Sequence, residues 1–233
     1  MNAGIIAAGL GERLRAHGIE TPKPLIPIGG RPLIARTIDG LYAAGVTRVA
    51  CIVNAETNAV RDYLRDSTWP IPVEVVQRTT ASSAESFLRL GPLLAHEPFL
   101  LTTVDTVCDP RALAALVERA RALGADASVL GVTTTVDDEK PLWAELDADD
   151  RIRSLDDPRH ARHVTAGVYF LQPLVYSLAD AGAERAFPAF RKVLGALLDR
   201  GHPLYGFDVG ASIDVDRPED IAAAERLLGV TAP

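Results

Sequence analysis

Residues Ile5–Leu33 read IIAAGLGERLRAHGIETPKPLIPIGGRPL, and the organisation of the remaining chain can be worked out from this stretch. An apolar run from Ala3 to Ala8 predicts a buried strand, which is broken by Gly9 and Gly11. Four prolines follow, at positions 22, 24, 27 and 32. Each proline lacks an N–H group and pushes the preceding residue toward extended geometry, which rules out a continuous helix. We therefore expect a long ordered loop beside the end of the first strand.

The composition of this loop favours a polyphosphate site. Gly9 and Gly11 have no side chain that would keep a ligand away from the backbone, so successive N–H groups can face an anion. Arg13 adds a planar fork of donors suited to phosphate oxygens, and Lys23 adds a point charge on a segment stiffened by prolines. Two better-known phosphate loops are excluded. No GxxxxGK[ST] string occurs, and a dinucleotide fingerprint would need glycine where this chain has Leu14.

Predicted strands and helices alternate along the rest of the chain. Apolar residues spaced along one helical face predict a helix at 33–44. Apolar runs predict strands at 49–53, 73–77, 98–104, 127–132 and 166–171. Further helices are expected at 56–65, 111–123, 174–181, 187–200 and 218–228, with strands at 202–207 and 213–215. This alternation implies an α/β fold with a parallel sheet and right-handed crossovers. We expect one domain over residues 1–233.

Composition and charge exclude several classes of protein. The net charge of -7 argues against a sequence-independent nucleic-acid binder, which needs a broad positive field. Two cysteines provide neither a disulfide framework nor the spacing of a zinc site. The N-terminus lacks a basic leader pattern, and no apolar run reaches the ~18 residues of a membrane span. We expect a cytoplasmic protein that binds neither nucleic acid nor membrane.

The loop motifs carry a family resemblance. GLGERL followed by TPKPLIPIGGRPLI resembles the signature of the nucleotidyltransferases that join a nucleoside triphosphate to a sugar 1-phosphate or a similar phosphorylated alcohol. The resemblance implies an enzyme that releases pyrophosphate and requires a divalent cation. It also implies a Rossmann-like, three-layer α/β/α fold with a mostly parallel mixed sheet.

Two aspartates are predicted to hold Mg²⁺. Asp105 follows the apolar strand at 98–104, and Asp214 lies in SIDVDRPED near the C-terminal end. One or two carboxylates usually hold this ion, and substrate phosphates and water complete its coordination. The family resemblance assigns the metal pair to these two residues. It prefers Asp214 over Asp216, because Asp214 aligns with the aspartate that opens the family's D-x-G-T-like segment.

The remaining site residues are assigned partly from charge and partly from the resemblance. Arg13 is expected to bind the departing β,γ-phosphates and Lys23 the α-phosphate, which makes them the catalytic pair. In the family a strand-end Gln and a glycine-containing turn meet the nucleobase; Gln77 matches the first, and Ser82 and Ser83 replace the second. The predicted nucleotide-binding residues are Ala8, Gly9, Leu10, Gly11, Gln77, Ser82 and Ser83.

Recognition of the acceptor is expected on the other side of the site. Residues 143–155 alternate around an acidic turn and predict a hairpin, so that 143–165 forms an elaboration on the acceptor side. The family often holds the acceptor phosphate with the lysine of a Glu-Lys-Pro-like segment, and the corresponding LDDPRHARH contains none. Arg159 is interpreted either as a substitute for this lysine or as an ordinary loop charge. Tyr169 either borders the acceptor or packs within its strand.

The leading hypothesis is a Mg²⁺-dependent nucleotidyltransferase whose partners are a nucleoside triphosphate and a sugar 1-phosphate. Two alternatives remain open at this stage. One is a cytidylyltransferase that uses phosphocholine or inositol phosphate. The other is a catalytically silent nucleotide-binding homologue, which Ser82 and the missing acceptor lysine would suit.

Overall fold

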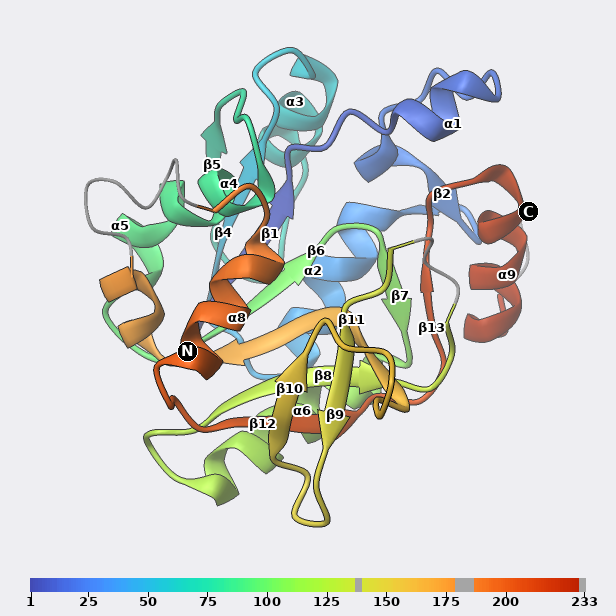
Figure 1. Ribbon diagram of the computed structural model, residues 1–233. Coiled ribbons are helices and arrows are strands. Elements are labelled where there is room, and N and C mark those ends of the chain that lie inside the picture. The colour runs from blue at the N-terminus through green and yellow to red at the C-terminus, as the bar shows by residue number, and fades with distance from the viewer. Residues whose placement is uncertain (137–139, 179–186, 231–233) are drawn as a thin grey trace.

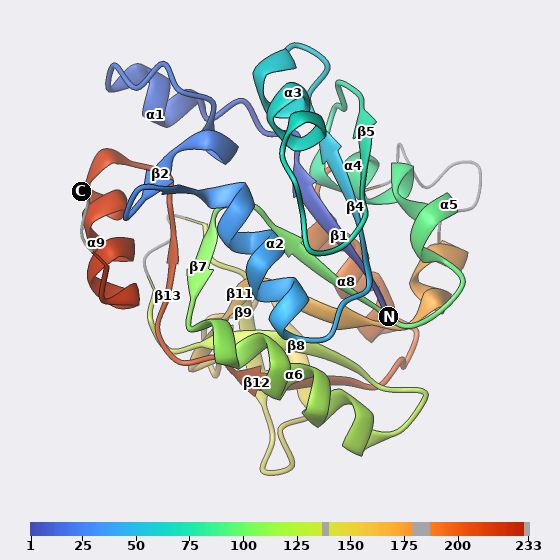
Figure 2. The same cartoon turned by 180° about the vertical axis from the view of Figure 1, so that it is seen from behind.

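The computed structural model describes residues 1–136, 140–178 and 187–230, and it shows a sheet covered by helices on both faces. Figure 1 shows α4 (Ser83–Arg89) and α8 (Phe190–Asp199) on one face. Figure 2 shows α2 (Leu33–Ala43) and α6 (Pro110–Leu123) on the other. The three-layer arrangement expected from the family resemblance is therefore present.

The main sheet is mixed, and the parallel strands β6, β1, β4 and β5 form one end of it. Within the described residues it has nine strands, in the order β10-β9-β11-β6-β1-β4-β5, with β8 paired to both β11 and β12. The strands are β1 (Asn2–Ala7), β4 (Arg48–Val53), β5 (Val73–Gln77), β6 (Phe99–Thr103), β8 (Ser128–Thr133), β9 (Trp143–Leu146), β10 (Ile152–Leu155), β11 (His163–Leu171) and β12 (Leu204–Asp208). β1 runs parallel to β4 and β6, whereas β11 runs antiparallel to its neighbours.

Two apolar cores lie on the opposite faces of this sheet, because successive residues of a strand point to opposite sides. On β6, Leu100 packs into the core that includes α2 and α6, whereas Leu101 packs into the core that includes α4 and α8. On β4, Cys51 and Ile52 divide in the same way. This explains why these strands read as continuous apolar runs in the sequence.

The predicted loop after β1 contains short pieces of regular structure. It holds the five-residue helix α1 (Glu12–Ala16), the 3₁₀ turn η1 (Lys23–Leu25) and a small hairpin of β2 (Pro27–Ile28) and β3 (Arg31–Pro32). A second two-stranded ladder pairs β7 (Thr106–Cys108) with β13 (Ser212–Asp214). The remaining helices are α3 (Asn58–Asp66), α5 (Gly91–Leu94), α9 (Pro218–Leu228) and the 3₁₀ turn η2 (Pro173–Leu178).

Several expected elements differ in detail. The segment expected as a helix at 174–181 is a 3₁₀ turn as far as Leu178, and its end lies outside the described residues. The hairpin expected over 143–155 is present as the antiparallel pair of β9 and β10. Helix α4 was not expected, although Ser82 caps it by accepting a hydrogen bond from the backbone N–H of Glu85. Ser followed three residues later by Glu is a start signal that predicts such a helix.

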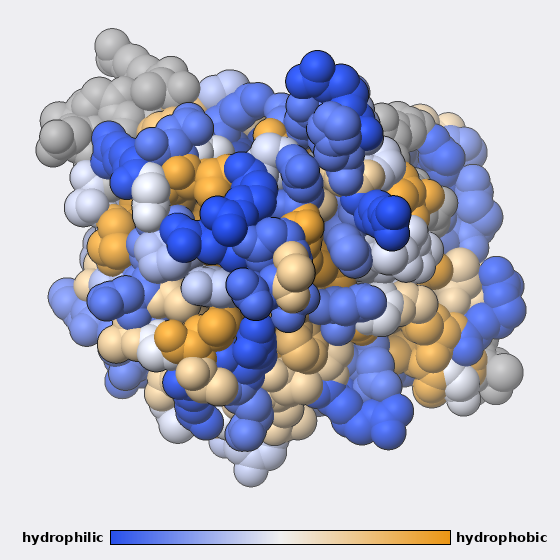
Figure 3. All heavy atoms as spheres, turned by 60° about the horizontal axis from the view of Figure 1, so that its bottom comes forward, coloured by the Kyte–Doolittle hydropathy of each residue, from blue (hydrophilic) through white to orange (hydrophobic). Residues whose placement is uncertain are grey.

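The surface combines hydrophilic residues with separate apolar patches on the face shown in Figure 3. Such a mixture is typical of protein surfaces. In the part of the chain that the structure describes, no helix is long and apolar enough to span a membrane.

Candidate active site

A cavity of about 660 Å³ opens at the carboxyl ends of β1 and β6. Open α/β sheets bind their ligands at this edge. The lining comes from the glycine loop at 8–13, Lys23, Asn54, the segment 79–83, Ser86 and the end of β6 at 103–105, together with Lys140, Arg191 and Asp216 from far along the chain. Most residues predicted from the sequence to bind phosphate are therefore brought together here.

Asn54 joins three chain segments at the base of this cavity. Its side chain is 4% exposed, and its Nδ2 donates to the carbonyl oxygen of Ala8 at 3.1 Å. Its Oδ1 accepts from the backbone N–H of Glu56 at 2.9 Å and from the hydroxyl of Thr79 at 3.2 Å. A polar residue placed directly after the apolar strand β4 is the sequence signal that could have identified it.

The glycine loop bends sharply to pass Lys23. Gly11 has a φ of 65°, in the left-handed region that favours glycine, and a Cβ added there would lie 3.1 Å from the Cβ of Lys23. By contrast, a Cβ added at Gly9 would meet no heavy atom within 4 Å. The backbone at Gly9 therefore faces open space within the cavity.

Lys23 lies at the centre of a compact cluster of charges. It is 7% exposed, and its Nζ donates to Oδ2 of Asp105 at 2.6 Å and to Oδ1 of Asp216 at 2.5 Å. Arg13 donates from its guanidinium to Oδ2 of Asp216 at 2.8 Å. Since both carboxylates contact one nitrogen atom, Asp105 and Asp216 lie close together. The two cations and two carboxylates border the same cavity.

The charges in this cluster stabilise one another. Burial disfavours the charged form of Lys23, but Asp105 and Asp216 outweigh it, so the pKa of the ammonium group lies above its ordinary value. Burial likewise disfavours the carboxylate of Asp105, but Lys23 outweighs it and lowers the pKa of this group. Lys23 is therefore an ammonium ion and Asp105 a carboxylate near neutral pH.

The β7–β13 ladder brings Asp216 to this cluster from the far end of the chain. β7 begins directly after Asp105, and the ladder register pairs Thr106 with Asp214. The backbone N–H of Val215 donates to the carbonyl oxygen of Asp105 at 3.0 Å. The chain then continues to Asp216, whose carboxylate reaches Lys23.

The sequence paired Asp105 with Asp214 as the expected metal ligands, and in the structure Asp216 is the residue of this segment that contacts Lys23. Oδ1 of Asp214 accepts a hydrogen bond from the hydroxyl of Thr106 at 2.9 Å, and this hydroxyl also lies 2.9 Å from that of Thr103. The two aspartates are separated by one residue, and the alignment with the family segment favoured Asp214, whereas Asp216 lines the cavity.

The residues expected to meet the nucleobase divide into two groups. Ser82 and Ser83 line the cavity, and the hydroxyl of Ser83 accepts a hydrogen bond from the backbone N–H of Phe190 at 3.0 Å. Gln77 instead contacts α3: its Nε2 donates to Oδ1 of Asn58 at 2.9 Å, and its Oε1 accepts from Arg61 at 3.2 Å. The structure does not bring Gln77 to the cavity lining.

The two acceptor candidates also lie outside this lining. Arg159 forms an ion pair with Asp157 at 2.6 Å, and its side chain is 79% exposed. Tyr169 is buried with its ring centroid 5.5 Å from that of Phe190, and burial raises the pKa of its hydroxyl to about 12. Tyr169 is therefore a packed strand residue.

Lys140 and Arg191 line the cavity instead, and the sequence interpretation missed both. The guanidinium of Arg191 donates to the carbonyl oxygen of Lys140 at 2.9 Å, which keeps the two residues adjacent. A sequence signal existed, because Glu-Lys-Pro does occur at 139–141, earlier in the chain than the segment LDDPRHARH where it was sought.

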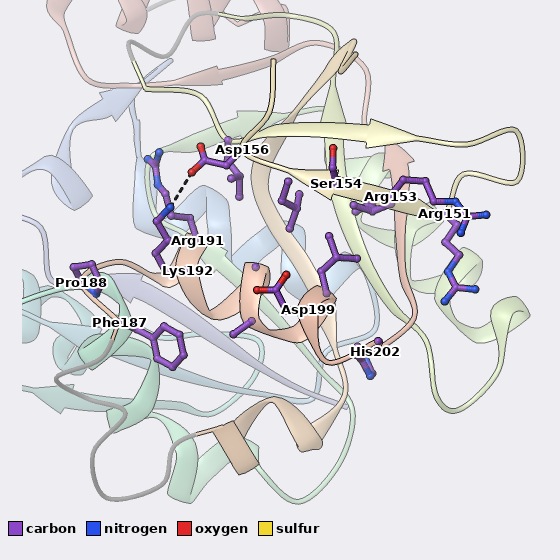
Figure 4. A pocket seen from close by; sticks show the side chains of 17 residues that line it. Arg151, Arg153, Ser154, Asp156, Phe187, Pro188, Arg191, Lys192, Asp199 and His202 are labelled. Carbon is purple, nitrogen blue, oxygen red and sulfur yellow. Dashed lines mark hydrogen bonds and ion pairs between the residues drawn. The ribbon is translucent and has the colours of Figure 1, made fainter. Parts of the chain in front are cut away.

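A second cavity, of about 770 Å³, lies between β10 and α8 and shares Arg191 with the first. Figure 4 shows Lys192 directed toward Asp156, with which it forms an ion pair at 2.8 Å. β10 of the hairpin therefore lines the second cavity, next to the Arg191 that the two cavities share.

Solved structures with the same fold include two nucleotidyltransferases. The inositol-1-phosphate CTP transferase from T. maritima has a TM-score of 0.82 at 23% sequence identity, and the match covers 99% of this chain and 98% of that one. A UDP-glucose pyrophosphorylase complexed with UDP-glucose has a TM-score of 0.81 at 17% identity and covers 97% of both chains. These likenesses confirm the expected α/β fold.

Sequence comparison identifies the family. The chain is 30% identical over 231 residues to a mannose-1-phosphate guanyltransferase of Candida albicans, and the match covers 93% of this chain and 61% of that protein. The chain thus spans about three fifths of the length of the curated relatives that it matches. The family model for the MobA-like NTP transferase domain matches residues 3–201, and this chain therefore belongs to that family.

Proposed function

We propose that this protein transfers a nucleotidyl group from a nucleoside triphosphate to a sugar 1-phosphate and releases pyrophosphate. The observation that carries the proposal is the convergence of Lys23, Asp105 and Asp216 beside the open backbone of Gly9. The names of the curated relatives, which are mannose-1-phosphate guanyltransferases, support a sugar 1-phosphate as the acceptor.

The reaction is a displacement at the α-phosphorus. An oxygen of the acceptor phosphate forms a bond to this phosphorus, the bond from the phosphorus to the bridging oxygen of the β-phosphate breaks, and pyrophosphate leaves with that oxygen. The attacking phosphate is already an anion and needs no general base. Alignment of the reactants and neutralisation of their charge therefore account for most of the rate.

The cations on one side of the cavity suit the triphosphate. Lys23 is positioned to stabilise charge on the α-phosphate, and Arg13 and the backbone of the glycine loop to bind the departing phosphates. When a triphosphate binds here, its oxygens would replace some of the carboxylate oxygens as hydrogen-bond acceptors for Lys23 and Arg13.

Asp105 and Asp216 fit the demands of Mg²⁺. Their carboxylate oxygens already converge on one positive charge, that of Lys23, and Mg²⁺ prefers oxygen ligands of this kind. Among the described residues no three metal-ligating side chains gather, so substrate phosphates and water would complete the coordination. When bound, the ion supplies neutralisation of the phosphate charge during the displacement.

The acceptor is expected on the side of Lys140 and Arg191. Both side chains line the cavity, and they come from parts of the chain remote in sequence from Arg13 and Lys23. Both carry a positive charge suited to a phosphate monoester. β10 lines the second cavity, which also contains Arg191, and this supports the assignment of 143–165 as an acceptor-side elaboration.

The activity can be tested by measuring pyrophosphate release with ATP, GTP, CTP and UTP against a panel of phosphate monoesters. The panel contains mannose 1-phosphate, glucose 1-phosphate, inositol 1-phosphate and phosphocholine, and GTP with mannose 1-phosphate is the first pair to test. We expect release with a sugar 1-phosphate and its abolition by Asp105→Asn. Release only with CTP and a non-sugar phosphate would establish the cytidylyltransferase alternative. No release with any pair would favour the silent homologue.

A smaller substitution tests the triphosphate position directly. Gly9→Ala adds a methyl group where no heavy atom lies within 4 Å, so thermal unfolding should change little. If phosphate oxygens lie against this backbone, affinity for inorganic tripolyphosphate should fall about tenfold, the scale of one hydrogen bond to a charged group. Calorimetric titration measures it. Gly195→Ala on α8 adds a methyl group into similarly open space and is the matched control; equal affinities for both variants would contradict the assignment.

A further inference from the structure

Asp216 lies in an irregular segment between β13 and α9, so no regular element fixes its backbone. The neighbouring contact on one side is the hydrogen bond from Val215 to the carbonyl oxygen of Asp105. On the other side, Oδ2 of Asp220 accepts from the backbone N–H of Asp216 at 2.8 Å and from that of Arg217 at 2.6 Å. One carboxylate oxygen thus holds two consecutive peptide groups next to the cavity.

Asp220 is suited to this task by its place on α9. It stands in the first turn of the helix and is 8% exposed, although it is charged. A carboxylate in the first turn is stabilised by the helix and by the N–H groups that it accepts from. Its position is therefore fixed by α9, and the backbone of Asp216 is fixed in turn.

The last turns of α9 hold another part of the site. Oε1 of Glu225 accepts from the backbone N–H of Gly29 at 2.9 Å, in the hairpin that follows Lys23 in the chain. Gly29 has a φ of 54°, and a Cβ added there would lie 2.5 Å from Cγ2 of Val230, just beyond the helix. α9 therefore contacts both the segment that carries Asp216 and the loop that carries Lys23.

We infer that α9 is a brace for the metal-binding carboxylate, and that Asp220 is a positioning residue that sets the place of Asp216 opposite Lys23 and Asp105. The inference rests on the proposed function. It concerns a part of the chain beyond residues 3–201, the region that the family model matches. Asp220 acts through the backbone of Asp216 and does not touch the substrate.

A simple helix cap would make a different prediction. Loss of a cap lowers the stability of the helix but leaves the affinity for metal unchanged at temperatures where the protein is folded. Loss of a positioning residue lowers metal affinity by about 10- to 100-fold while the protein remains folded. Asparagine keeps an acceptor oxygen at the same place, so Asp220→Asn should preserve the positioning.

The experiment measures Mn²⁺ binding by electron paramagnetic resonance with inorganic tripolyphosphate present, a probe that requires no knowledge of the base. We expect Asp220→Ala to weaken Mn²⁺ binding about tenfold or more, and Asp220→Asn to stay within about twofold of the parent. Glu219→Ala, which removes an exposed carboxylate from the same turn, is the matched control and should bind as the parent does. The unfolding midpoint of each variant is measured first, and Mn²⁺ binding is then measured at a temperature at which all variants are folded.

Asp220→Ser provides a second route if the alanine variant does not fold. Serine suits the first turn of a helix, but its shorter side chain cannot hold both N–H groups, and the same weakening is expected. Parent-like Mn²⁺ binding by the alanine or serine variant, or a loss as large in Asp220→Asn, would overturn the inference. If the parent binds no Mn²⁺, or binds it equally after Asp105→Asn, the proposed function itself fails, and the inference with it.

Discussion

Lys23→Met is expected to lower kcat by about 10²- to 10³-fold, the effect of removing one donor that stabilises charge in a transition state. Methionine fills a similar volume, so the loss is mainly that of the ammonium group. Lys23 is 7% exposed and contacts two carboxylates. Water therefore has little access to the position of its ammonium group. Steady-state pyrophosphate release at saturating substrates measures the change.

The matched control for this variant is Arg15→Met, which removes an exposed cation from α1 without touching the cavity lining. Its kcat should stay within about twofold of the parent. Lys23→Arg should not restore the rate, because the planar guanidinium cannot replace a compact ammonium in a buried position. A kcat unchanged in Lys23→Met, with only the unfolding midpoint lowered, would show that Lys23 is a structural ion-pair partner.

Asp216→Asn is expected to lower kcat by at least about 100-fold, whereas Asp214→Asn should lower it less than about tenfold. The first variant removes a charge that faces Lys23 and Arg13 in the cavity. The second keeps a side-chain oxygen that can still accept the hydrogen bond from Thr106. Both substitutions preserve side-chain size, so the comparison isolates charge. The rate should be measured over a series of Mg²⁺ concentrations.

The reverse order of these two effects would restore Asp214 as the metal ligand, in agreement with the family alignment and against the geometry. Equal large losses would mean that both carboxylates act in the site. The unfolding midpoints of the two variants separate either result from a loss of folding.

The sequence specified most of the fold because its signals are local. The expected strand at 73–77 and the expected helix at 218–228 have the observed boundaries, and the helix at 33–44 ends one residue late. Apolar runs and a single helical face produce these elements without help from distant residues. The helix α4 was missed although its capping serine and glutamate are also local.

The site residues could be predicted only where the neighbouring sequence indicates the role of a residue. Asp105 follows one apolar strand, and Gly9 and Gly11 interrupt the chain after another. These three residues could therefore be recognised as candidate site residues. The choice between Asp214 and Asp216 depends on the register of the β7–β13 ladder, a long-range pairing that one sequence does not reveal. The contacts of Gln77 with α3 are equally non-local.

The ion pair between Lys23 and Asp216 joins residues that are 193 positions apart in the chain. Closing so large a loop costs conformational entropy before any contact compensates for it, and we therefore expect this contact to form late in folding. The parallel sheet can therefore assemble around its apolar cores while the phosphate cavity is still incomplete. Binding competence is expected to be acquired after the secondary structure, as a separate kinetic phase.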